Sequence, residues 1–142
     1  MKKIALTTVS FLLLFLYACS AGGTQAGSSV AQNPANTTYQ TIQPSEAKAL
    51  MEDGQPYILL DVRTQDEFEE ARIEGAVLIP DYEIEDTAAT KLPDKEARIL
   101  VYCRSGRRSA ASAQKLADMG YTNVFDFGGI IDWPYQTVSG QE

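Results

Sequence analysis

The sequence contains no histidine, and this absence excludes several kinds of active site. Papain-like and caspase-like hydrolases activate a cysteine with a histidine, so a Cys-His dyad cannot exist in this chain. The chain also has only two cysteines. With no histidine and so few thiols, mainly carboxylates remain as metal ligands, which is a poor set for zinc or another transition metal. We therefore expect neither a metal nor a cofactor.

Positive charge is scarce as well. The chain has 12 lysines and arginines against 19 aspartates and glutamates, and its formal net charge is −7. Leaving out Lys2 and Lys3, which belong to the N-terminal segment described next, lowers the basic count to 10 and the net charge to −9. We do not expect so acidic a chain to bind nucleic acid or an anionic membrane surface, although a local arginine cluster can still bind small anions.

Long hydrophobic runs are missing too. The apolar segment at residues 4–17 is interrupted by threonine and serine, and it is shorter than the ~20 residues that span a bilayer core. It follows two lysines and precedes small residues, an arrangement typical of a secretory signal. We expect residues 1–18 to be a cleaved signal peptide rather than a membrane-spanning anchor.

The end of this segment offers a lipidation site at Cys19. Residues 16–19 resemble the lipobox of bacterial lipoproteins, in which cleavage leaves the cysteine as an acylated first residue. Tyr17 is unusual in that motif, and ordinary cleavage that uses Ala18 and Ser20 as the small pair would remove Cys19 instead. We favour lipidation, which with two or more acyl chains anchors a protein stably. The predicted location is a cell-envelope membrane, on its periplasmic or other extracytoplasmic face.

The rest of the chain divides into a linker and a domain. Residues 20–38 have no charge and no aromatic side chain, and we expect them to form a flexible tether. Residues 39–138 then supply one domain with one core. Since Cys19 is either lipidated or removed, Cys103 is left as the single thiol of the mature protein, and it cannot form an internal disulfide.

Cys103 lies between an apolar, strand-like stretch at residues 99–102 and an alanine-rich, helix-like stretch at residues 109–119. A thiol at such a junction faces the free backbone N–H groups and the positive end of the helix dipole, which favour an anion and a thiolate. The alternative is a small buried hydrophobe that ends a strand. We favour a functional thiol, because a glycine and three arginines stand beside it: Gly106, Arg104, Arg107 and Arg108.

Short apolar stretches alternate with helix-like stretches along the domain. This order predicts an α/β fold with a central, mainly parallel sheet covered on both faces. Ligands bind outside the carboxyl ends of the strands in such sheets, where Asp61 and Cys103 both lie. We predict strands at residues 39–42, 57–60, 76–79, 98–102 and 123–127, and helices at 44–53, from 64 to before 75, at 109–119 and in a short segment ending near 133, with 82–90 ambiguous.

Three segments of the domain form a specific pattern when they occur in this order. They are residues 60–63 followed by Glu67-Phe68 and Gly75-Ala76, the Cys-x-x-Gly-x-Arg loop at 103–108, and residues 128–133. With these segments the chain resembles single-domain rhodanese-type sulfurtransferases over residues 39–135. The resemblance implies a three-layer α/β sandwich around a five-stranded sheet, with a Cys103 that accepts a sulfane sulfur as a persulfide and passes it to a nucleophile. Arg72 stands where many family members carry histidine, which we interpret as variation of the scaffold.

The resemblance also implies roles for the residues around the thiol. The whole loop, including Ser105 and Gly106, is expected to bind the donor. Arg104 and Arg107 are candidates for attracting an anionic donor, although Arg107 could equally be a solvated helix start, and Arg108 is expected to bind the anion or brace the loop.

Residues outside the loop are expected to support it. Asp61, with Arg63 beside it, either pairs with an arginine and holds the loop or is an ordinary carboxylate at the end of a strand. Glu67 is expected to cap its helix, and Trp133 to belong to the core. Gly128 and Gly129 are expected to supply backbone conformations that other residues disfavour.

The expected function is transfer of a sulfane sulfur from an anionic donor such as thiosulfate to cyanide or a thiol, including that of a thioredoxin-like protein. A Cys-based phosphatase or arsenate reductase is the nearest enzymatic alternative. Those enzymes place five residues between the cysteine and an arginine, and this chain has Ser109 at that position. We expect the shorter loop to cradle a sulfur atom rather than a tetrahedral oxyanion. A non-catalytic carrier of persulfide or sulfide, or a module that binds a redox partner, is a further alternative.

Overall fold

The computed structural model describes residues 39–140. The predicted signal peptide, the lipidation at Cys19 and the tether at residues 20–38 lie outside these residues. Within the described range, no helix has the length and apolar character needed to cross a membrane.

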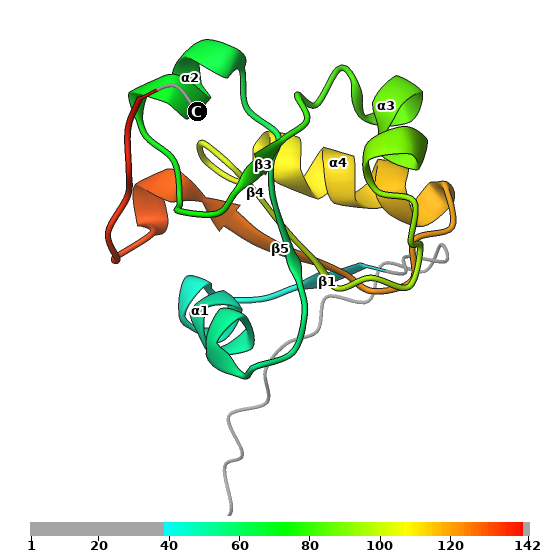
Figure 1. Ribbon diagram of the computed structural model, residues 1–142, viewed down its shortest axis with the longest axis horizontal. Coiled ribbons are helices and arrows are strands. Elements are labelled where there is room, and N and C mark those ends of the chain that lie inside the picture. The colour runs from blue at the N-terminus through cyan, green and yellow to red at the C-terminus, as the bar shows by residue number, and fades with distance from the viewer. Residues whose placement is uncertain (1–38, 141–142) are drawn as a thin grey trace, which may run out of the picture.

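A five-stranded sheet forms the centre of the structure (Figure 1). Every pairing between its strands is parallel, so the predicted α/β fold with a mainly parallel sheet is confirmed. Its inner strands are continuous apolar runs because both of their faces are covered. The spatial order is β1 (Tyr39–Thr41), β5 (Val124–Gly129), β4 (Ile99–Cys103), β2 (Ile58–Asp61) and β3 (Val77–Leu78).

Helices cover both faces of the sheet (Figure 1). One face packs against α3 (Ile84–Lys91) and α4 (Arg107–Asp118) through an apolar cluster that includes Val101 and Leu116. The opposite face packs through a second cluster that includes Leu100 and Trp133. Alternate residues of β4 thus enter different layers, as the two-residue period of a strand requires. The second layer contains α1 (Pro44–Glu52), α2 (Gln65–Glu70) and the short helix η1 (Ile130–Asp132).

The helix that follows β2 is shorter than the sequence pattern predicts. α2 ends at Glu70, and Ala71 is already extended, with φ −162°. The carbonyl oxygen of Ala71 accepts a hydrogen bond from the Arg63 guanidinium at 2.6 Å. Arg72 then pairs with Val138 in an isolated antiparallel bridge. Contacts with distant segments therefore draw the chain away from the helix after Glu70.

Two elements next to the Cys103 loop begin or end closer to it than predicted. β5 continues past Phe127 to Gly129, because its last residue still pairs with Cys103 across a shift in register. α4 begins at Arg107 rather than Ser109. The ambiguous residues 82–90 contain most of α3. The remaining predicted boundaries differ from those observed by at most one residue.

Candidate active site

Cys103 ends β4, the third of the five strands in spatial order, at the carboxyl edge of the sheet. Its side chain is buried, with 1% exposed. The backbone N–H of Gly106 donates a hydrogen bond to the Cys103 Sγ at 3.1 Å. Gly106 is the N-cap of α4 and has φ +95°, in the left-handed region that favours glycine. The loop therefore holds the sulfur beside the free N–H groups at a helix N-terminus, which is an anion-binding position.

The backbone at the end of β5 lies very close to the backbone of the Cys103 loop. A Cβ added at Gly129 would overlap the carbonyl oxygen of Arg104 and would lie 2.7 Å from the Ser105 Cα. The N–H of Ile131 donates to the same Arg104 oxygen at 3.3 Å. Gly129 is therefore needed for its small size, which lets the end of β5 lie directly against the Cys103 loop.

Ser109 joins the Cys103 loop to the end of β5. Its Oγ lies 3.0 Å from the carbonyl oxygen of Gly106 and 3.2 Å from that of Gly128, and the residue is fully buried. Asp126 lies nearby on β5 and is also buried. Burial raises the pKa of Asp126 above its ordinary value, and the hydrogen bond of 3.0 Å from the Gly128 N–H opposes this rise.

Two of the three loop arginines face solvent. Arg104 and Arg107 are exposed, and within residues 39–140 no carboxylate forms an ion pair with either of them. Both guanidinium groups are therefore accessible to an anion, and their role in attracting the donor stays a prediction, as does the alternative of a solvated helix start for Arg107. Ser105 is exposed between them and Cys103.

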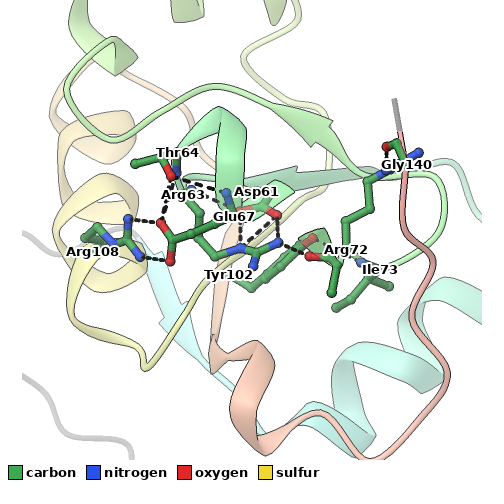
Figure 2. A network of polar contacts seen from close by, with 10 residues as sticks. Asp61, Arg63, Thr64, Glu67, Arg72, Ile73, Tyr102, Arg108 and Gly140 are labelled. Atoms are coloured by element: carbon green, nitrogen blue, oxygen red, sulfur yellow. Dashed lines mark hydrogen bonds and ion pairs between the residues drawn. The ribbon is translucent and has the colours of Figure 1, made fainter. Parts of the chain in front are cut away.

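Arg108 makes a different contact, because its charge is already paired. Its guanidinium forms two hydrogen bonds of 2.7 Å each to the carboxylate of Glu67 on α2 (Figure 2). These bonds raise the pKa of Arg108, burial opposes the rise, and the nearby Cys103 adds to it. Of the two roles considered for Arg108, this geometry favours bracing the loop over free anion binding.

Glu67 serves two partners at once. It completes the predicted capping box with Thr64, whose N–H donates to Glu67 Oε2 at 3.1 Å while the Thr64 Oγ1 accepts from the Glu67 N–H at 3.3 Å. Its hydrogen bonds from Arg108 lower the pKa of its carboxyl group to about 2, with burial opposing this effect. The sequence pattern identified the cap, but nothing in it pointed to the ion pair.

Asp61 and Arg63 lie at the same edge of the sheet but do not contact the loop arginines. The Arg63 side chain donates to both carboxylate oxygens of Asp61, at distances from 2.6 to 3.0 Å (Figure 2). The pair is buried, and the Arg63 guanidinium lies 5.6 Å from the centre of the Tyr102 ring. The Tyr102 hydroxyl accepts a hydrogen bond from the Ile73 N–H at 3.2 Å. This network therefore joins β2 to β4 next to Cys103 and is a support rather than part of the anion site.

Arg72, the departure from the family pattern, contacts the end of the described chain. Its guanidinium donates to the Gly140 carbonyl oxygen at 2.6 Å and lies 4.8 Å from the centre of the Phe68 ring. Trp133 is buried in the core, as expected. Among residues 39–140, no group of three or more carboxylates and thiols is arranged to hold a metal ion. The arrangement instead offers one buried sulfur beside amide donors and two unpaired cations.

Comparisons with known proteins agree with this geometry. Residues 43–134 match the family described as Rhodanese-like domain. The thiosulfate sulfurtransferase PspE of Escherichia coli K12 is 37% identical over 81 residues, which cover 57% of this chain and 78% of that protein. The adenylyltransferase and sulfurtransferase UBA4 of Candida albicans is 32% identical over 99 residues, but the match covers only 23% of that larger protein and 65% of this chain.

Solved structures share the fold. An E. coli rhodanese determined with anions has a TM-score of 0.57 and 35% identity, covering 60% of this chain and 100% of that one. A rhodanese-like domain protein from Staphylococcus aureus has a TM-score of 0.61 and 28% identity, covering 71% of this chain and 98% of that one. Since the family match includes the sheet from β2 to β5, the Cys103 loop and η1, the chain belongs to the family of rhodanese-like domains.

Proposed function

We propose that this protein is a sulfurtransferase that takes a sulfane sulfur from thiosulfate or a similar anionic donor. The observation that carries the proposal is the hydrogen bond from the Gly106 N–H to the Cys103 sulfur, at an edge where Arg104 and Arg107 are exposed. The 37% identity to a thiosulfate sulfurtransferase supports the same donor class. Small anions would be attracted to this edge in spite of the net negative charge of the chain.

The reaction proceeds in two displacement steps. The Cys103 thiolate attacks the outer sulfur of thiosulfate, the S–S bond of the donor breaks, and sulfite leaves with the electron pair. The persulfide anion is stabilised by the loop N–H groups, of which Gly106 is the one that contacts the sulfur directly. A nucleophile then attacks the outer persulfide sulfur and releases the Cys103 thiolate. Cyanide is the acceptor in the assay, and a thiol, such as that of a thioredoxin-like protein, is the proposed acceptor in the cell.

Mass spectrometry tests the first step. The purified chain is treated with thiosulfate, and the added sulfur is located by peptide mapping. We expect a gain of one sulfur on Cys103, which cyanide removes as thiocyanate over many cycles. Cys103→Ser should neither load nor turn over, whereas Cys19→Ser, the matched change at the other cysteine, should do both in a soluble assay. Loading with no repeated turnover would contradict an enzyme and indicate a carrier. No loading would contradict this donor class.

We further propose that the protein is exported and lipid-anchored through Cys19. The proposal is supported by the basic start, the short apolar segment and the lipobox-like residues 16–19. Labelling of cells with a palmitate analogue should mark the wild-type chain in the membrane fraction. Cys19→Ser should lose the label, and Cys103→Ser should keep it. An unlabelled wild-type chain, or a labelled Cys19→Ser chain, would contradict the anchor.

A further inference from the structure

Asp126 places a carboxyl group inside an apolar sheet. It lies on β5, opposite Thr41 of β1 and Val101 of β4, and only 4% of it is exposed. Asp61, which is also buried, is paired with Arg63. Within the described residues no lysine or arginine forms an ion pair with Asp126. Burying an acid without a cation is costly, so its hydrogen bonds must compensate.

One of those hydrogen bonds leads directly to the Cys103 loop. The Asp126 Oδ1 accepts from the Gly128 N–H at 3.0 Å, which orients the chain just before Gly129 lies against the loop. The carbonyl oxygen of the same Gly128 lies 3.2 Å from the Ser109 Oγ, which is 3.0 Å from the carbonyl oxygen of Gly106. Asp126 therefore holds Gly128, which Ser109 joins to the residue whose N–H contacts the sulfur.

We propose that Asp126 is a positioning residue that keeps the Cys103 loop in its anion-binding shape. It acts through Gly128 and does not touch the sulfur or the donor. In the proposed function the anion is the sulfur donor, and to that extent the inference rests on that function. The same geometry should nevertheless act on any anionic electrophile that attacks Cys103.

Asparagine can keep the hydrogen bond from Gly128 and leucine cannot. An asparagine at residue 126 has a carbonyl oxygen that can accept from the Gly128 N–H. Leucine has the same number and branching of side-chain heavy atoms and suits the apolar surroundings, but its methyl groups are larger than the carboxylate oxygens and form no hydrogen bonds. Asp126→Asn therefore keeps the hydrogen bond that Asp126→Leu removes.

The test compares two alkylating reagents on Cys103 of the full chain, with the product located by peptide mapping. Iodoacetate is anionic and iodoacetamide is neutral, and the thiolate displaces iodide from both. The ratio of the two rate constants cancels the thiolate fraction and reports how well the loop receives an anion. We expect the wild-type ratio to exceed that of a small free thiol. Asp126→Leu should lower it about tenfold, less than the effect of removing an oxyanion donor itself, and Asp126→Asn should stay near the wild type.

Control variants separate positioning from general damage. Val124→Ala truncates a buried residue that packs in the α4 layer and pairs with Ile99, at the opposite end of β4 from Cys103, so the ratio should not change. Ser109→Ala removes the contacts that join Gly128 to Gly106 and should lower the ratio, and this variant tests the proposal if Asp126→Leu does not fold. A wild-type ratio equal to that of a free thiol would overturn the proposal, as would an unchanged ratio in the folded Leu variant or a loss in Asp126→Asn equal to that in Asp126→Leu.

The two proposals can fail separately. Alkylation requires no sulfur transfer, so a wild-type chain that prefers iodoacetate but never loads from thiosulfate would refute the proposed donor and leave the role of Asp126 standing. If the chain turns over thiosulfate but wild type and Asp126→Leu have the same alkylation ratio, the role of Asp126 would be refuted and the proposed donor would stand.

Discussion

Arg108 and Glu67 form an ion pair between residues 41 positions apart in the chain. The pair joins the first turn of α4 to the first turn of α2 through two parallel hydrogen bonds (Figure 2). Such a bidentate contact requires the planar guanidinium of arginine and could not be reproduced by lysine. The loop is therefore braced against α2 by one arginine, while Arg104 and Arg107 keep their charges free for an anion.

Replacing Arg108, which is paired, should mainly affect stability, and replacing Arg107, which is not, should mainly affect the KM for thiosulfate. Arg108→Ala should lower the free energy of unfolding by about 1 kcal/mol, because the partly buried pair with Glu67 is lost. Arg107→Ala should change it by less than about 0.5 kcal/mol, but it should raise the KM for thiosulfate several-fold. Urea unfolding and steady-state kinetics of both variants measure this. A larger stability loss in Arg107→Ala would contradict the assignment.

The stability of the fold should decline in acid partly because of Glu67. Its pKa in the folded protein is about 2, held there by Arg108, against an ordinary value of 4.5. A pKa that is lowered by folding contributes stability above the unfolded value, and this contribution is lost as the pH falls from 4.5 towards 2. Urea unfolding between about pH 6 and about pH 3 should therefore show a shallower decline in Glu67→Gln than in the wild type.

The control for this pH dependence lies on the same helix. Glu70 is exposed at the end of α2 and forms no ion pair within the described residues. Glu70→Gln changes the net charge by the same amount and should keep the wild-type decline. Equal slopes in Glu67→Gln and the wild type would mean that the pair with Arg108 contributes nothing at neutral pH.

Gly129→Ala should damage both stability and activity. The added methyl group would overlap the backbone of Arg104 and Ser105, which cannot move without shifting the Cys103 loop. We expect a loss of about 1–3 kcal/mol in the free energy of unfolding, with sulfur transfer reduced at least tenfold. Gly54→Ala is the matched control, because a Cβ at Gly54 meets no atom within 4 Å although its φ of +78° is unfavourable for alanine. Gly54→Ala should therefore lose stability but keep its sulfur-transfer activity. Full activity in Gly129→Ala would show that the close approach is dispensable.

Two buried serines of α4 allow a paired comparison. The Ser109 hydroxyl contacts the carbonyl oxygens of Gly106 and Gly128, whereas the Ser112 hydroxyl has no hydrogen-bond partner within residues 39–140. Ser109→Ala should cost about 1 kcal/mol of unfolding free energy and slow thiocyanate formation. Ser112→Ala should be neutral or slightly stabilising and leave turnover unchanged. The same effect in both variants would indicate that only packing is affected at Ser109.

The local parts of the site could be predicted from the sequence because they depend on neighbouring residues. An apolar run, a glycine and a helix start place Cys103 at a strand-to-helix junction, and Thr64 and Glu67 are spaced as a capping box. Alternating strand and helix signals were enough to predict a parallel sheet. Each of these signals involves residues close together in the sequence, so local backbone geometry alone determines which groups meet.

The contacts that shape and brace the loop could not be predicted in this way, because they join residues far apart in the chain. The position of Glu67, three residues after Thr64, predicted a helix cap, but only the packing of α2 beside α4 brings the Glu67 carboxylate to Arg108. In the sequence Asp126 is only a polar residue that interrupts an apolar strand, and the structure shows that its carboxyl group accepts the Gly128 N–H next to the Cys103 loop.

The fold class, the place of Cys103 between a strand and a helix, and the arginines beside it could thus be predicted from the sequence, because they follow from local propensity, charge and the period of apolar residues. The three-dimensional packing was needed to show which arginine is paired, why Gly129 must be small and which groups lie next to the Cys103 loop. These depend on distances of a few ångströms between β4, β5, α2 and α4, which are set when separate segments bury their apolar faces together.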